Sequence, residues 1–306
     1  MLKLPFRTFR FELKTEQPFY LPAYAGSMMR GGFGRSFRRI SCAFGRKPCE
    51  ECMLRSRCFY HRIFETTTDK PGRPFQTTHP YIIRPIQKLG GKEEAEVLSL
   101  EVTLMDDALD ALPHFVYAFI EFGRFGMGKE RAQFELDRVV SKGDILYQNG
   151  DSNIELPAEP MILDSFMEPV PDSVQQVQLR FLTPVRAKIR QRYRSKLSFQ
   201  DIVRLSTRRV RELSRALERE DPFTEKTNKL MEQALDVRTV SSNCRWFDWR
   251  RYSSRQQQAM HLGGVVGEMS FEGDLAPYVP LLKAGEVLHI GKNTSFGLGK
   301  VEVEIG

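Results

Sequence analysis

The sequence predicts an α+β protein in which one order of elements, strand–helix–strand–strand–helix–strand, occurs twice. Three observations lead to this prediction. Short segments alternate apolar and polar residues, longer segments repeat apolar residues at helical spacing, and a glycine-rich loop precedes the last strand of each half. The order is that of the ferredoxin-like (βαββαβ, RRM-like) fold, and 306 residues suffice for two tandem domains of this kind.

The first half supplies the elements of a domain at residues 1–141. Helices are expected at 27–40 and 106–122, the first of them containing Gly31, Gly32 and Gly34. Glycine costs a helix about 1 kcal/mol relative to alanine, so these three need a reason, such as the close approach of another backbone. Strands are expected at residues 2–14, 81–86, 96–105 and 132–140.

The second half repeats this arrangement at residues 173–306. Residues 142–172 are rich in Pro, Gly, Asp and Asn and are expected to link the two domains. Helices are expected at 198–217, with Ser198 as the N-cap, and at 275–282. Strands are expected at residues 174–182, 246–252, 263–271 and 300–305.

Positive charge is concentrated in two segments. Residues 180–219 hold 13 basic and 3 acidic residues, and residues 1–62 hold 13 and 4, although the whole chain has a net charge of only +7. Two solvated helix faces would explain this pattern, but two basic segments on an otherwise acidic chain favour a surface for a polyanion. Arginine outnumbers lysine 11 to 2 in the second segment, which favours planar contacts with phosphates and bases of a nucleic acid.

Four cysteines lie within 17 residues, in an insertion at about residues 42–60. Cys42, Cys49, Cys52 and Cys58 have the spacing C-x6-C-x2-C-x5-C, which resembles a structural zinc knuckle. An iron–sulfur cluster and unligated thiols are the alternatives. Four thiolates would leave no open position for water, so such a site would be structural, while Cys244 stands alone as a small buried residue.

Two further features concern location and the second glycine-rich loop. The chain contains no run of about 18 apolar residues and no secretory signal, so we expect a cytoplasmic protein without a membrane partner. The loop Gly291–Gly299 is not a Walker motif, because Asn293 follows Lys292 where Ser or Thr would be required. It is either a tight hairpin or a loop that presents backbone amides to phosphate.

Several segments together resemble a known family. They are Trp246-Phe-Asp-Trp-Arg-Arg-Tyr, Leu262-Gly-Gly-Val-Val-Gly, Leu288-His-Ile-Gly-Lys-Asn-Thr-Ser-Phe-Gly-Leu-Gly-Lys, Phe181-Leu-Thr-Pro-Val-Arg, Thr207-Arg-Arg-Val-Arg and Gly26-Ser-Met-Met-Arg-Gly-Gly-Phe-Gly-Arg. They are similar to the repeat-processing endoribonucleases of CRISPR systems, in the RAMP superfamily, and the last is similar to the first helix of a cysteine-bearing branch.

The resemblance implies a metal-independent endoribonuclease with no catalytic cofactor. Members bind the hairpin repeat RNA of precursor CRISPR transcripts and cleave it into guide RNAs for antiviral defence. The ribose 2′-hydroxyl attacks the adjacent phosphate and leaves a 2′,3′-cyclic phosphate. Such chemistry needs a base, an acid and cations around the phosphorane. Many relatives carry a histidine in the first helix where this chain has Arg35, which is a poor base and a good charge stabiliser.

The sequence therefore nominates Arg35 and His61 as catalytic candidates, His61 being the histidine nearest the basic helix in sequence. The expected RNA-binding residues are Arg30, Arg38, Arg39, Arg186, Lys188, Arg190, Arg192, Arg194, Arg208, Arg209, Lys292, Asn293, Thr294, Ser295 and Phe296. The run from Arg186 to Lys196 has basic residues at every second position, which predicts charges on one side of an extended segment or loop.

Two other functions remain open at this stage. A repeat-RNA-binding subunit of a CRISPR effector complex, without cleavage, is favoured by the missing helix histidine. A zinc-held scaffold that docks on another RNA-bound protein would bind free RNA weakly and with little salt dependence. Other CRISPR effector subunits are further expected partners, and no DNA partner is expected.

Overall fold

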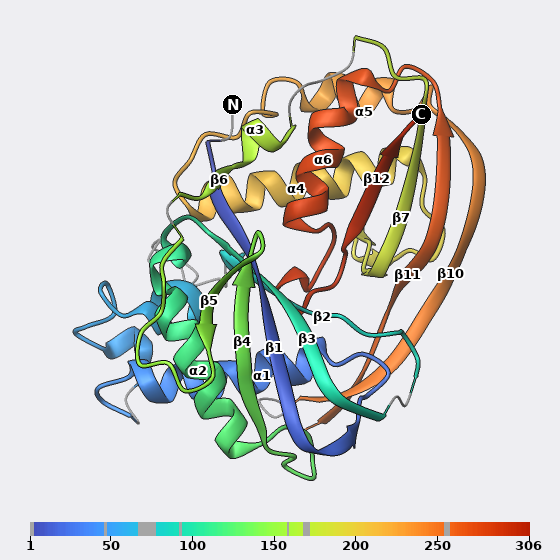
Figure 1. Cartoon of the computed structure of the whole chain (residues 1–306). Coiled ribbons are helices and arrows are strands. Elements are labelled where there is room, and N and C mark those ends of the chain that lie inside the picture. The colour runs from blue at the N-terminus through green and yellow to red at the C-terminus, as the bar shows by residue number, and fades with distance from the viewer. Residues whose placement is uncertain are drawn as a thin grey trace. The chain divides into compact units, whose positions relative to one another are not determined.

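The structure is a computed structural model that describes residues 3–45, 48–66, 78–91, 94–157, 159–167, 172–253 and 258–306. Figure 1 shows its helices and strands along the chain. The chain divides into two compact units, here called the N-terminal unit (Pro5–Pro160) and the C-terminal unit (Met161–Gly306 together with the start of the chain). The predicted α+β class and the tandem ferredoxin-like order are confirmed.

The N-terminal unit is built on an antiparallel sheet in the order β2-β3-β1-β4-β5. Phe11 of β1 is paired with Leu100 of β3, and Leu13 of β1 with Leu136 of β4. Its elements are β1 (Pro5–Tyr20), α1 (Gly26–Ser41), η1 (Cys49–Glu51), η2 (Tyr60–Glu65), β2 (Tyr81–Pro85), β3 (Glu94–Met105), η3 (Asp106–Ala111), α2 (Leu112–Phe125), β4 (Phe134–Ser141) and β5 (Asp144–Gln148).

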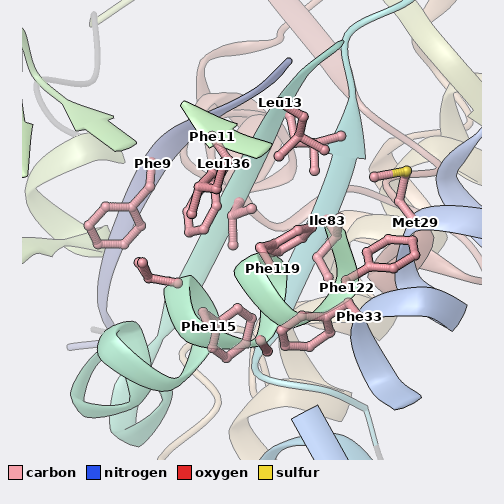
Figure 2. Packing of buried hydrophobic residues seen from close by; sticks show 14 of the residues in the cluster. Phe9, Phe11, Leu13, Met29, Phe33, Ile83, Phe115, Phe119, Phe122 and Leu136 are labelled. Carbon is pink, nitrogen blue, oxygen red and sulfur yellow. The ribbon is translucent and has the colours of Figure 1, made fainter. Parts of the chain in front are cut away.

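Aromatic side chains dominate the core of this unit. The ring of Phe33 on α1 lies 4.5 Å from that of Phe115 and 5.3 Å from that of Phe119, both on α2. Phe119 in turn lies 5.1 Å from Phe11 of the sheet, so the two helices and the sheet meet in one aromatic cluster (Figure 2). Aromatic pairs of this kind contribute about 0.5–1.5 kcal/mol beyond the area that they bury.

The glycines of α1 make room for rings rather than for another backbone. A Cβ atom on Gly32 would lie 1.9 Å from the Phe122 ring, and one on Gly34 would lie 2.0 Å from the Phe64 ring. Nothing lies within 4 Å of a Cβ built on Gly31, so two of the three glycines have a steric reason, and it is an aromatic ring instead of the expected backbone.

The C-terminal unit contains a second antiparallel sheet, in the order β10-β11-β7-β12. Its central strand β7 pairs Leu179 with Met269 of β11 on one side and with Val303 of β12 on the other. The elements are β6 (Met161–Ile162), α3 (Leu163–Met167), β7 (Gln176–Val185), β8 (Lys188–Ile189), β9 (Arg192–Tyr193), α4 (Phe199–Ala216), α5 (Thr227–Gln233), β10 (Arg238–Ser253), β11 (Gln258–Glu272), η4 (Ala276–Tyr278), α6 (Val279–Leu288), η5 (Thr294–Phe296) and β12 (Val301–Ile305).

The capping prediction for α4 is confirmed. The backbone amide of Asp201 donates to the Ser198 hydroxyl at 3.2 Å, and the amide of Ser198 donates to the Asp201 carboxylate at 3.2 Å. This reciprocal capping box fixes the start of a helix that carries five arginines.

Several elements differ from the sequence prediction. The segment 142–172 contains β5, which extends the N-terminal sheet because Asp144 and Gln148 pair with Ser141 and Arg138. The boundary between the units, after Pro160, lies inside this segment. Helix α6 begins at Val279 and runs to Leu288, six residues beyond the predicted end. Pro280 occupies its first turn, where proline needs no amide partner, and is therefore compatible with the helix.

The basic run after Pro184 is a hairpin rather than one extended segment. Lys188 pairs with Tyr193 and Ile189 with Arg192, and the two residues between the strands, Arg190 and Gln191, have φ values of 46° and 66°. The turn breaks the alternation that the sequence prediction assumed. In the part of the chain that the structure describes, no helix combines the length and apolar character needed to cross a membrane.

Candidate nucleic-acid interface

The glycine-rich loop between α6 and β12 is held against the end of β7. The Ile290 amide donates to the Gly299 carbonyl at 2.9 Å, and the Lys292 amide donates to the Arg186 carbonyl at 3.1 Å. Gly299 has φ +77°, and a Cβ there would lie 1.8 Å from the Ile290 oxygen. Only glycine fits this position, because both the backbone angle and the contact exclude a side chain.

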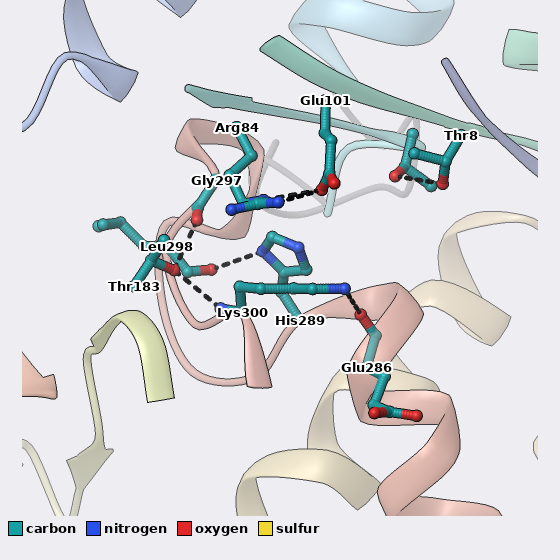
Figure 3. Close-up of polar contacts among 10 residues, drawn as sticks. Thr8, Arg84, Glu101, Thr183, Glu286, His289, Gly297, Leu298 and Lys300 are labelled. Carbon is teal, nitrogen blue, oxygen red and sulfur yellow. Dashed lines mark hydrogen bonds and ion pairs between the residues drawn. The ribbon is translucent and has the colours of Figure 1, made fainter. Parts of the chain in front are cut away.

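Side chains anchor the loop at further points (Figure 3). The Thr183 hydroxyl donates to the Gly297 carbonyl at 2.7 Å and accepts the Lys300 amide at 2.9 Å. His289 lies at the end of α6 with φ 58°, and its Nδ1 is 3.1 Å from the Leu298 oxygen. The loop is therefore fixed from both ends before any ligand binds.

Four cations surround one carboxylate beside this loop. A small hollow is lined by Lys188 of β8, by Arg208, Arg209 and Glu212 of α4, and by Lys292 of the loop, among others. Arg208 Nε lies 2.7 Å from a Glu212 oxygen, and Lys292 Nζ lies 3.6 Å from the same oxygen. The side chains thus leave a surplus of positive charge next to the loop.

The pKa values of this cluster follow from burial and charge. Burial alone would raise the pKa of Glu212, but the hydrogen bond from Arg208 and the charges of Lys292, Arg208 and Arg209 outweigh it and hold that pKa below its usual value. Burial lowers the pKa of Arg209 to about 10, against the raising effect of Glu212. Arg209 is 3% exposed and donates from Nε to the Leu288 carbonyl at 2.9 Å, so it supports the loop from beneath rather than facing solvent.

The β8–β9 hairpin adds a second group of cations. Arg186 is buried, donates to the Gly263 carbonyl at 3.2 Å and lies 4.5 Å from the centre of the Tyr193 ring. Arg190 and Arg192 at its turn are exposed, and their guanidinium groups form no hydrogen bond or ion pair with a described residue. Arg194 is also exposed, but its guanidinium is 3.3 Å from the Asp201 carboxylate.

The loop residues nominated from the sequence divide by exposure. Asn293 is exposed with φ 65°, and Lys292 and Phe296 are partly exposed. Thr294 and Ser295 are each 7% exposed, so their side chains belong to the loop's own packing. The sequence could not distinguish the exposed loop residues from the buried ones, because their exposure depends on the backbone conformation of the loop.

A separate basic surface lies on α1 of the N-terminal unit, which carries four arginines and no acidic residue. Arg35 is exposed, and its side chain makes no hydrogen bond, ion pair or ring contact with a described residue. Arg39, also exposed, lies 4.6 Å from the centre of the Phe125 ring, and Arg38 lies 5.8 Å from that of Tyr60.

His79 contacts this helix and was not selected from the sequence. Arg30 Nη2 lies 2.9 Å from His79 Nε2, and His79 Nδ1 lies 2.9 Å from the Thr66 hydroxyl. Arginine can only donate, so Nε2 accepts, and the proton of the neutral ring sits on Nδ1. The Arg30 guanidinium also lies 4.3 Å from the centre of the Phe64 ring. Sequence distance pointed to His61 instead, since His79 is 49 residues from Arg30.

His61 lies elsewhere in the same unit. It is 9% exposed and lines a cavity at the end of α1 together with the four cysteines of the insertion. Among the described residues, no hydrogen bond, ion pair or ring contact links the Arg35 side chain to His61.

Comparisons with known proteins cover both units. A family model named AF_1859_N, described as an N-terminal domain, matches residues 4–159, and the model of the CRISPR-associated endoribonuclease Cas6 matches residues 179–301. An uncharacterized protein of Archaeoglobus fulgidus is 23% identical in an alignment 305 residues long, which covers 92% of this chain and 92% of that protein.

Solved structures show the same fold. A Cas6 product complex matches with a TM-score of 0.59 at 18% identity, over 98% of this chain and 99% of that one. A Thermus thermophilus Cas6 matches with a TM-score of 0.56 at 17% identity over the same shares of the two chains. A partial Cas6-RT-Cas1–Cas2 complex matches with a TM-score of 0.58 at 13% identity, over 99% of this chain and 46% of that one. Both basic surfaces lie within the matched regions. The chain belongs to the family of the AF_1859_N model, which matches just over half of it, and residues 179–301 match the model of the CRISPR-associated endoribonuclease Cas6.

Proposed function

We propose that the protein binds CRISPR repeat RNA and cleaves precursor CRISPR transcripts by metal-independent attack of a ribose 2′-hydroxyl on the adjacent phosphate. One observation carries the RNA-binding part. The glycine-rich loop is fixed against β7 beside Lys188, Arg208 and Lys292, which outnumber the single carboxylate of Glu212. Preformed cations beside a fixed loop suit a phosphate backbone, because little ordering is needed on binding.

Arg35 is the proposed charge stabiliser. It is exposed on a helix without acidic residues, and no described side chain competes for its guanidinium. A planar, permanently charged group can donate to two oxygens of one phosphate and so stabilise the negative charge that develops in the phosphorane. It cannot act as the base, because arginine keeps its proton.

His79 is the proposed proton acceptor. It is partly exposed, and its ring nitrogen Nε2 faces Arg30. A phosphate that draws Arg30 into a contact of its own would release the lone pair of Nε2 for the 2′-hydroxyl. His61, the candidate nominated from the sequence, is nine-tenths buried beside the cysteines, so its ring is a poorer acceptor for a large substrate.

A non-catalytic repeat-RNA-binding subunit is the second candidate function. The specific observation in its favour is Arg35, which stands where many relatives carry a first-helix histidine. The two functions share the RNA surface and differ only in whether the bound RNA is cut. A hairpin repeat and other CRISPR effector subunits are the proposed partners in either case.

The test is a single-turnover cleavage assay of the full chain with its cognate repeat RNA in excess chelator. A matched RNA carries one 2′-deoxy ribose at the cleavage site. We expect the first RNA to be cut and the second to stay intact, because transesterification requires the 2′-hydroxyl. Tight binding of uncut RNA would support the binding subunit, and no binding would exclude both functions.

Three variants locate the chemistry. Arg35→Ala should lower the cleavage rate about 100-fold, the usual effect of removing one donor to a developing oxyanion. His79→Ala should lower it by about 100-fold or more, as expected of a general base. His61→Ala is the matched control and should keep the rate within about threefold. A rate lost in His61→Ala and kept in His79→Ala would reassign the base to His61.

A further inference from the structure

The segment between α1 and η2 has little of its own to hold it in place. Its described residues are 42–45 and 48–58, and the short helix η1 within it has no buried residue. Met53 is 80% exposed, Phe44 47% and Leu54 45%. A segment of this size that buries so few apolar side chains usually needs a covalent or metal staple to stay folded.

All four cysteines of this segment line one cavity. Cys42, Cys49, Cys52 and Cys58 surround a space of about 280 Å³ at the end of α1, and each is a partly buried free thiol. Cys42 directly follows the helix and Cys58 lies two residues before η2, so the cavity joins both ends of the segment.

The turn between the middle two cysteines is already formed. The Cys52 amide donates to the Cys49 carbonyl at 3.1 Å, which closes the C-x2-C stretch into a single turn of η1. This spacing is typical of a pair of thiolate ligands to one metal ion. Cys58 Sγ is directed toward the other end of the segment, 3.9 Å from the Ser41 carbonyl oxygen.

We propose that Cys42, Cys49, Cys52 and Cys58 bind one zinc ion as thiolates, and that this ion holds the insertion to the end of α1. The proposal does not depend on the RNA chemistry. Among the described residues, no group of three or more His, Cys, Asp or Glu side chains is arranged to hold a metal ion. Zinc binding therefore requires the segment to contract, because zinc–sulfur bonds of about 2.3 Å bring four sulfurs to about 3.8 Å from one another.

The surroundings suit the charge of such a site. Four thiolates and one Zn²⁺ carry a net charge of −2 once the thiol protons have been released to solvent. Arg55 and Arg57 line the same cavity. Nearby cations favour thiolates over thiols and so favour the metal-bound form. With four sulfur ligands the ion has no open position, and its role is structural.

Metal content of the purified full chain is the first test. We expect about one zinc per chain in the native protein, and less than one-fifth of that in Cys52→Ser. The control is Cys244→Ser, which changes the fifth thiol, on β10, whose Sγ is 3.4 Å from the Glu268 carbonyl oxygen. Cobalt in place of zinc should give the absorption bands of a tetrahedral cobalt thiolate. Equal zinc in all three proteins, iron with sulfide, or no metal would each overturn the zinc site.

Limited trypsin digestion tests whether the ion holds the segment in place. It uses native protein alone, so the result does not depend on whether a variant folds. Arg55 and Arg57 lie inside it, and Arg57 is exposed. Zinc-loaded native protein should be cut at these arginines at least tenfold more slowly than the same protein after its zinc has been removed, and zinc added back should restore protection. Equal rates with and without zinc would show that no ion holds the insertion.

Discussion

The basic surface of α1 and the basic surface beside the glycine-rich loop collect the same kind of charge by different means. On α1, four arginines share a helix with no acidic residue, and aromatic rings lie beneath Arg30 and Arg39. Beside the loop, the cations are gathered around Glu212, and the backbone needs positive φ at Gly291, Gly297 and Gly299. The surface on α1 is formed by the positions of its arginines along the helix. The surface beside the loop depends on a backbone conformation that few residues other than glycine adopt.

The largest difference between the two surfaces should appear when alanine replaces glycine. Gly299→Ala places a Cβ 1.8 Å from the Ile290 oxygen at φ +77°, so we expect a loss of about 3 kcal/mol in the free energy of unfolding. Gly31→Ala, on the open side of α1, should instead add about 0.5–1 kcal/mol, because alanine favours a helix.

Each variant has its own measurement. Both tryptophans, Trp246 and Trp249, lie on β10, so tryptophan fluorescence during urea unfolding reports the C-terminal unit for Gly299→Ala. For Gly31→Ala, circular dichroism during urea unfolding measures the change in the free energy of unfolding. Equal stability of Gly299→Ala and the native protein would show that the loop backbone is not fixed as described.

Alanine substitutions of two neighbouring arginines of α4 should also differ in their effect on the free energy of unfolding. Arg209→Ala removes a buried guanidinium that donates to the Leu288 carbonyl, and we expect a cost of about 2 kcal/mol. Arg208→Ala removes an exposed cation at the surface and should cost less than about 1 kcal/mol. Urea unfolding of both variants checks this order, and a reversed order would contradict the supporting role of Arg209.

Salt dependence of RNA binding should separate the contributions of the two surfaces. Replacing both Arg190 and Arg192 with alanine should reduce the slope of log K against log salt by about 1.4–1.8, since each lost phosphate contact removes about 0.7–0.9. Arg35→Ala should reduce it by about 0.7–0.9. Titration of labelled repeat RNA at several salt concentrations measures both slopes, and an unchanged slope would remove that surface from the RNA contact.

The smallest effect concerns Glu212. Its pKa is lowered in the folded protein, so its ion pairs stabilise the fold above the unfolded pKa of about 4.5, and this stability is lost as the pH falls below that value. Native protein should therefore be slightly more stable than Glu212→Gln at pH 7, and the difference should shrink as the pH falls below about 4.5. Thermal unfolding of the pair across this range tests the sign. A difference that grows toward acid pH would contradict it.

The sequence predicted elements better than it predicted exposure. Alternation and helical spacing located α1, α4 and most strands of the two sheets, because each depends on local side-chain periodicity. The turn at Arg190 and Gln191, and the burial of Arg209, Thr294 and Ser295, depend on neighbours distant in the chain. His79 was missed for the same reason, since β2 and α1 are brought together only by the sheet and the aromatic core.

The most direct test of the proposed function is the chemistry of the ends that the protein leaves on RNA. The full chain would be incubated with its cognate repeat RNA in excess chelator, and the products would be identified by mass spectrometry. The proposal predicts one product that ends in a 2′,3′-cyclic phosphate and another that begins with a 5′-hydroxyl. Products with a 3′-hydroxyl and a 5′-phosphate, or RNA that is bound and left intact, would contradict it.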